Sequence, residues 1–309
     1  MPRALKWAEA ENRGSGVQIG KILLRNAKIE VKGVAIGDFD ADIQFDKTGK
    51  IVKANARAKD GKWTLDMSPN KPDAAQGAPA TASGGDSFGE WAVEFTARNL
   101  TLPMGVPLLF GAVTAKGTMT AGGMTIPQVE AKLLEGSVTG NLKIDWKQQV
   151  SYSGEFTADK IKVEQLTEIF TRDVALHGRM EGQFTASGSA PSIGELMDRP
   201  TVQGVFNVKD GSIGNVDLVQ VMRSPGSVGG QSKFVELNGQ LRIADRVIHY
   251  EKLKLTGGVL IANGAVNVNL SNSNLSGTVS AEIRSSVAQD RGTFIVTGKT
   301  SRPALKRGG

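Results

Sequence analysis

The residues that could support catalysis or metal binding are few and lie far apart in the sequence. The chain of 309 residues contains two histidines, His177 and His249, and no cysteine. A zinc centre or a histidine-dependent catalytic pair needs further ligands or a carboxylate beside each imidazole, and the flanking sequence offers no such cluster. The lack of cysteine also excludes a disulfide framework, a thiolate metal site and a cysteine nucleophile. We therefore interpret both histidines as unrelated strand residues and expect no metal or cofactor.

A second candidate is a row of carboxylates. Asp38, Asp40 and Asp42 alternate with apolar residues, which places all three on one face of a predicted strand. Such a row could hold Ca²⁺, but an EF-hand loop needs glycine at its sixth position and glutamate at its twelfth. Those positions hold Ile43 and Gly49. We expect a solvated outer strand face here.

The glycine-rich stretch 226–233 ends in Ser232 and Lys233 and is superficially similar to a phosphate-binding loop. The order Gly-Lys-Ser/Thr is missing, and no long helix follows to offer its N-terminus to a phosphate. A flexible connection is the better interpretation. Because the sequence also lacks a nucleophile elbow and any convergent acid–base group, we predict that the protein is not an enzyme.

The chain is basic, with a net charge of +6, and its densest basic region lies between residues 47 and 62. Its cations are Lys47, Lys50, Lys53, Arg57, Lys59 and Lys62. They could contact lipid phosphates, at about 1 kcal/mol for each cation near an anionic surface, or simply form a solvated hairpin. No aromatic side chains interleave them to stack bases, so nucleic-acid binding is not expected.

The clearest signal for structure is a period of two between residues 201 and 300. Segments 240–243, 265–270 and 278–284 alternate apolar and polar residues. This period is typical of strands with one buried and one wet face, so this region predicts an antiparallel meander. Earlier strands are predicted at 20–24, 27–32, 37–45, 51–58, 62–67, 91–97, 113–121, 128–134 and 137–146. In the third of these, Phe39, Ala41, Ile43 and Phe45 share one face.

The sequence divides at one low-complexity stretch. We predict an N-terminal β segment over 1–67, a flexible loop over 68–90 and a C-terminal β region over 91–309. A unit of glycine, any residue and an apolar residue opens many of the strands, which favours a long curved sheet built from similar hairpins. Its glycines are Gly136, Gly140, Gly154, Gly178, Gly182, Gly204, Gly239, Gly264, Gly277 and Gly292.

Short amphipathic helices are expected to act as lids or edge plugs on this sheet. Val163, Leu166 and Phe170 give one apolar helical face, and 192–198 opens with a capping-box spacing. Asn215 is a candidate cap for a third helix, which presents Leu218, Val221 and Met222. A helical lead-in is also predicted at 5–13. The fold class predicted is therefore mostly β, a curved antiparallel sheet forming an open groove with a few short helices.

The order of these elements resembles the C-terminal region of AsmA family proteins. The resemblance is carried by residues 178–188 (GRMEGQFTASG), the short helix expected at Ser192, residues 202–213 (VQGVFNVKDGSI) and a closing Val-Thr-Gly at 296–298. It extends from about Gly136 to Lys306. The family's hairpin turn that often holds Asp-Gly has Asp245 followed by Arg246 here, so its turn type stays open.

The resemblance implies a protein of the Gram-negative periplasm, tethered to the inner membrane by an N-terminal helix. It further implies an apolar β-groove that binds or conducts phospholipid acyl chains and supports outer-membrane integrity. Residues 1–20 contain no apolar stretch, so we expect the chain to be a fragment that lacks this anchor.

Nine residues are predicted to line the apolar face as the lipid-binding surface. They are Phe206, Val208, Leu241, Ile243, Val266, Val268, Leu270, Val279 and Ile283. Acyl chains suit such a face, because their burial contributes roughly 0.8 kcal/mol per CH₂ without fixed polar contacts. Two alternatives stay open: the same residues form an ordinary core beneath the helices, or the protein is a periplasmic scaffold for an envelope protein partner.

Overall fold

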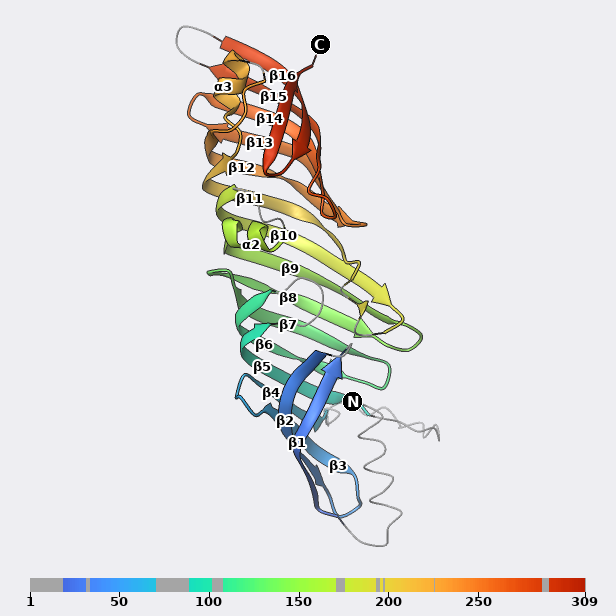
Figure 1. Ribbon diagram of the computed structural model, residues 1–309. Helices are drawn as coiled ribbons and strands as arrows, with labels where there is room; N and C mark the ends of the chain where they lie inside the picture. The colour runs from blue at the N-terminus through green and yellow to red at the C-terminus, as the bar shows by residue number, and fades with distance from the viewer. Residues whose placement is uncertain are drawn as a thin grey trace, which may run out of the picture.

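The computed structural model describes residues 19–31, 34–70, 89–101, 108–170, 176–192, 195–196, 198–224, 226–284 and 289–308. These residues form one 17-stranded antiparallel sheet in which each strand pairs with the next along the chain. The sheet is open and curved, with β1 and β17 towards opposite ends of an elongated molecule (Figure 1). The predicted fold class is confirmed.

The strands are long for a meander. The first eight are β1 (Lys21–Val31), β2 (Val34–Phe45), β3 (Ile51–Ala58), β4 (Trp63–Pro69), β5 (Trp91–Thr101), β6 (Leu109–Met119), β7 (Gly123–Leu133) and β8 (Gly136–Asp145). The others are β9 (Val150–Lys162), β10 (Leu176–Ala190), β11 (Thr201–Gly214), β12 (Gln231–Ala244), β13 (Val247–Gly257), β14 (Leu260–Asn269), β15 (Leu275–Arg284), β16 (Gln289–Lys299) and β17 (Arg302–Arg307). Two α-helices are present among the described residues, α2 (Val163–Phe170) and α3 (Leu218–Arg223).

The two strands predicted at 20–24 and 27–32 are one strand, β1. The pairing with β2 shifts between Leu24 and Ala27, and Asn26 adopts a φ of 54° there. Asparagine tolerates this left-handed conformation, so the chain accommodates a bulge without ending the strand. The backbone N–H of Asn26 donates to Asp40 at 3.0 Å, which satisfies the donor that the bulge releases from the ladder.

The predicted division around residues 68–90 does not separate two sheets. Residues 71–88 lie outside the described residues, but β4 continues through Ser68 and Pro69 and pairs directly with β5. The hydrogen-bonded ladder therefore runs from the N-terminal segment into the C-terminal region without a break.

The predicted helix at 192–198 is wrong for the part that the structure describes. Glu195 donates to the Ser192 carbonyl at 3.1 Å, and Asp198 donates to Glu195 at 3.0 Å, which are turn hydrogen bonds between residues three apart. The sequence disfavours a helix here, because Gly194 has a low helix propensity and Pro200 disfavours the helical conformation at Arg199. The helical lead-in predicted at 5–13 lies outside the described residues.

The helix α3 begins two residues later than predicted. Asp217, with extended backbone, is the N-cap, and its carboxylate accepts a hydrogen bond from the backbone N–H of Gln220 at 3.0 Å. Asn215 instead sits at a φ of 64° in the approach to the helix. The prediction that Leu218, Val221 and Met222 share a buried face is confirmed.

The hairpin between β12 and β13 closes with a two-residue turn. Asp245 and Arg246 have φ values of 48° and 62°, which is the type I′ geometry that matches the twist of the flanking strands. The Asp-Arg pair therefore adopts the turn that Asp-Gly forms more easily.

Candidate functional site

The apolar face of the sheet carries a row of residues that runs through every strand. Each member lies opposite the next in the strand register, so the row crosses the strands at right angles. From β1 to β17 it reads Leu24, Ala41, Ala56, Leu65, Phe95, Ala115, Val129, Gly140, Phe156, Phe184, Gly204, Leu241, Tyr250, Val266, Gly277, Val296 and Leu305. We call it the central row. Only Tyr250 brings a polar group into it.

Apolar rows flank the central row on both sides. One reads Trp63, Ala97, Val113, Ala131, Val138, Ala158, Gly182, Phe206 and Gly239 from β4 to β12. The other reads Ile126, Leu142, Gly154, Ala186, Val202, Ile243, Ile248, Val268 and Leu275 from β7 to β15. The face is thus a continuous apolar strip, which we call the trough.

The two ends of the trough are packed. At the C-terminal end, α3 lies on the apolar face, and its buried residues join one cluster with Val208, Phe294 and Val296 (Figure 1). At the N-terminal end, Phe45, Trp91 and neighbouring apolar residues form a second cluster. Between these clusters the central row is only half-buried at Phe95, Val129 and Phe156. The N-terminal cluster reaches as far as β8, because Ile22 and Phe45 pack with Met119 and Trp146. A third cluster packs Leu142 and Ala186 of a flanking row with Tyr152.

The structure places eight of the nine predicted residues in strands on this one face. Phe206, Val208 and Val268 are buried. Leu241, Val266, Val279 and Ile283 are partly buried and pack against the C-terminal cluster, while Ile243 is half-buried in a flanking row. The ninth residue, Leu270, follows β14 in a turn, where its N–H donates to the carbonyl of Arg246 at 2.8 Å. Most of the predicted set therefore lies in the packed C-terminal part of the trough.

The more exposed part of the trough has a floor of glycine and phenylalanine that the sequence analysis did not single out. Its members are Gly140, Gly154, Phe156, Gly182, Phe184 and Gly204, on β8 to β11. We call them the glycine–phenylalanine floor. The available signal was the Gly-x-Phe spacing at 154–156 and 182–184, within the more general glycine pattern already noted.

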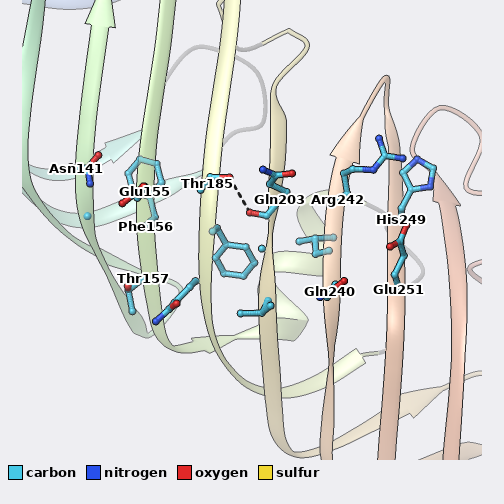
Figure 2. Close-up of a pocket in the computed structure, with 16 residues that line it drawn as sticks. Asn141, Glu155, Phe156, Thr157, Thr185, Gln203, Gln240, Arg242, His249 and Glu251 are labelled. Atoms are coloured by element: carbon cyan, nitrogen blue, oxygen red, sulfur yellow. Dashed lines mark hydrogen bonds between the residues drawn. The ribbon is translucent and has the colours of Figure 1, made fainter.

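A hollow over the same strands is lined chiefly by polar side chains of the opposite face. It has a volume of about 760 Å³ and spans β8 to β13. Figure 2 shows Glu155, Thr185, Gln203, Arg242 and His249 around it, in successive register. Members of the central row also line it, where they alternate with these polar residues along the strands: Gly140, Phe156, Phe184, Gly204 and Leu241.

The histidines and the aspartate row that the sequence analysis considered for catalysis or metal binding do not form a site. Nδ1 of His249 lies 2.8 Å from Oδ1 of Asn267, and His177 is three strands away on β10. Asp42 forms ion pairs with Lys21 at 3.2 Å and Arg25 at 3.1 Å, which lower its pKa. These carboxylates thus face basic side chains on a solvated strand face, as predicted.

The basic region at 47–62 also lies on the surface. Lys59 pairs with Asp40 at 3.8 Å and Lys62 with Asp60 at 3.1 Å. Lys53 and Arg57 are exposed on β3. Within the described ranges, no group of acidic, histidine or cysteine side chains is arranged to hold a metal ion.

Two titrating groups have strongly shifted pKa values. Burial of Tyr250 in the central row raises its pKa to about 12, and its ring meets Phe206 edge-on at 6.0 Å. Hydrogen bonds from Arg284, Arg291 and Gln289 lower the pKa of Glu282 to about 2. Neither group adjoins a second one that could exchange a proton with it in an acid–base pair.

Fold and site together define an open, all-antiparallel sheet with one apolar strip along its length. In the part of the chain that the structure describes, no helix is both long and apolar enough to cross a membrane. Comparisons with protein-family models, curated proteins and solved structures gave no match.

Proposed function

We propose that the protein binds or conducts phospholipid acyl chains along the trough, without catalysing a reaction. The observation that carries the proposal is the central row, in which one residue from each of 17 strands contributes to an apolar line. The members that stay half-buried, such as Val129 and Phe156, leave apolar surface in contact with water, and such surface marks a binding site.

The chemistry of the trough suits acyl chains in particular. Its rows consist of aliphatic, aromatic and glycine residues, and Tyr250 is the sole polar member of the central row. Each CH₂ group removed from water contributes roughly 0.8 kcal/mol, whatever its position along the row. A chain held this way can shift from strand to strand, because no directional contact must be broken.

The cellular setting follows from the resemblance to AsmA family proteins and belongs to the same proposal. The protein would act in the periplasm of a Gram-negative bacterium, in association with the inner membrane. There it would support assembly or integrity of the outer membrane. The elongated trough, whose strands stack along the long axis of the molecule, supports this role (Figure 1).

Native mass spectrometry of the purified chain tests the proposal. We expect adducts with the masses of phospholipids, which are lost after delipidation and restored by vesicles of phosphatidylethanolamine and phosphatidylglycerol. A chain that stays free of lipid under these conditions, but is retained by an envelope protein, would instead support a scaffold with a self-packed face.

A further inference from the structure

We infer that the polar hollow over β8 to β13 is a binding site for an uncharged glycan chain, which lies across the strands on the face opposite the trough. The hollow has a volume of about 760 Å³, and Figure 2 shows the polar side chains around it. The site does not depend on the lipid-binding role proposed above, because its side chains alternate with those of the central row and point to the other face.

Two rows of side chains border the hollow, and in each row the members are register partners on successive strands. The first polar row reads Asn141, Glu155, Thr185, Gln203, Arg242 and His249. The second polar row contains Gln183, Val205, Gln240 and Glu251. The central row runs between them, whereas Gly154 and Gly182, which share its face two positions away, do not line the hollow. The hollow therefore lies between two polar rows, with the backbone of the central row as its floor.

The charged groups at the hollow are not neutralised by one another. Glu155, Arg242 and Glu251 are exposed and form no ion pair within the described structure. By contrast, on two of the same strands and the same face, Lys209 pairs with Glu181 at 2.9 Å. The three charged groups at the hollow therefore keep their hydrogen-bonding capacity for solvent or for a ligand.

The amide side chains at the hollow are equally available. Gln183, Gln203 and Gln240 each carry one acceptor oxygen and an NH₂ donor, and none of these groups bonds to another described residue. A sugar hydroxyl also both donates and accepts, so it can pair with either end of an amide. The carboxylates accept from hydroxyls, and the guanidinium of Arg242 donates to them, in charge-assisted bonds. An uncharged polyol can therefore use all of these groups.

Other classes of ligand fit the hollow less well. One cation, Arg242, faces the two carboxylates Glu155 and Glu251, so the charge does not favour a polyanion. An acyl chain would bury these polar groups without partners. A peptide that adds a strand needs free backbone groups, but every strand from β8 to β13 is already paired on both sides.

The dimensions of the hollow suit a chain of several sugar rings. Adjacent strands lie about 4.8 Å apart, so β8 to β13 span roughly 24 Å. Val205 lies among the polar members of the second polar row and is 49 % exposed. Its side chain offers an apolar contact for the C–H groups of a sugar ring, while the neighbouring amides reach the ring hydroxyls.

Isothermal titration calorimetry with a hexamer of N-acetylglucosamine tests this site, because the probe is uncharged and carries hydroxyl and amide groups. Gln203→Ala and Arg242→Ala each remove one member of the first polar row. The matched controls are Gln128→Ala on β7 and Arg98→Ala on β5, which are exposed on the same face but do not line the hollow. Far-ultraviolet circular dichroism confirms that all four variants are folded.

We expect the wild type to bind the hexamer, Gln203→Ala to raise the Kd severalfold and Arg242→Ala to raise it about tenfold, because a hydrogen bond to a charged group contributes more. Both controls should bind like the wild type. Lack of binding by the wild type, or equal weakening by the variants and their controls, would overturn the inference. Tighter binding of a heparin hexasaccharide than of the uncharged hexamer would also overturn it, since the site would then select polyanions. Each of these outcomes leaves lipid binding in the trough as a separate question.

Discussion

Phe184 on β10 lies directly opposite Gly204 on β11, and its Cδ1 atom is 2.6 Å from the position that a Cβ atom of residue 204 would occupy. The ring and the glycine thus share one volume on the apolar face. The carbonyl oxygen of Gln183 lies closer still to that position. Residue 204 therefore has no room for even a methyl group unless the backbone of β10 moves.

Gly204→Ala is expected to destabilise the protein by about 1–3 kcal/mol, the usual cost of overpacking a well-filled site. The measurement is the free energy of unfolding in urea. Gly89→Ala is the control, because a Cβ atom there would have no neighbour within 4 Å. Equal effects of the two substitutions would contradict the proposed packing of Phe184 over Gly204.

The attachment of α3 to the trough depends on its N-cap. Asp217→Ala removes the carboxylate that accepts from the N–H of Gln220, and should cost about 1 kcal/mol of unfolding free energy. Asp217→Asn keeps an oxygen acceptor at the cap and should retain most of the stability. If both variants lose the same stability, the cap geometry described for α3 is wrong.

A buried hydroxyl holds the approach to α3 against β12. Ser232 donates to the carbonyl of Val216 at 2.9 Å and accepts from the N–H of Leu218 at 2.9 Å. Ser232→Ala leaves both backbone groups unsatisfied in a buried place, so a loss of about 1–3 kcal/mol is expected in urea unfolding. Exposed Ser276 on β15 serves as the control, and Ser276→Ala should change stability by less than about 0.5 kcal/mol. Matching losses from the two serines would refute the role of Ser232.

Glu282 makes stability depend on acid pH. Its pKa is lowered to about 2 by hydrogen bonds from Arg284, Arg291 and Gln289, with Arg291 at 2.9 Å. A depressed pKa in the folded state contributes stability that is fully present above the unfolded value of roughly 4.3 and is lost as pH falls towards 2. The stability difference between wild type and Glu282→Gln should therefore shrink steadily as the pH is lowered through this window.

The control for this pH dependence is Glu251→Gln, since Glu251 is exposed and forms no ion pair within the described structure. Substitution of this exposed carboxyl group should change the free energy of unfolding at neutral pH by less than about 0.5 kcal/mol. A difference for Glu282→Gln that grows on acidification has the wrong sign and would contradict the assignment.

Most strands could be predicted from the sequence, because apolar and polar residues alternate along each of them. The faces of β2 and β14 could be read directly from residues such as Ile43 and Val266. The cap of α3 was placed wrongly because Asn215 and Asp217 are both good capping residues, and only the backbone conformation separates them. Local composition does not decide such choices.

The continuity of the trough could not be predicted in the same way. Which residues lie opposite one another depends on turn lengths and on bulges, such as the register shift between Asn238 and Gln240 on β12. The sequence pattern shows that Phe156 and Phe184 are apolar, but not that they are register partners between two glycines. This explains why the predicted site residues gathered at the C-terminal end.

The central claim is that the half-buried middle of the trough holds lipid, and retention of phospholipid by paired variants tests it most directly. Val129 lies in the central row, and Glu130 is exposed on the opposite face of β7. Delipidated protein would be incubated with radiolabelled phosphatidylethanolamine vesicles, and the lipid that co-elutes with the monomer would be counted. Far-ultraviolet circular dichroism confirms that both variants are folded.

We expect Val129→Asn to lower the retained lipid severalfold, because it places an amide in the path of the acyl chain, and Glu130→Gln to leave retention unchanged. Equal retention by wild type and both variants, or no retention by wild type, would contradict the account.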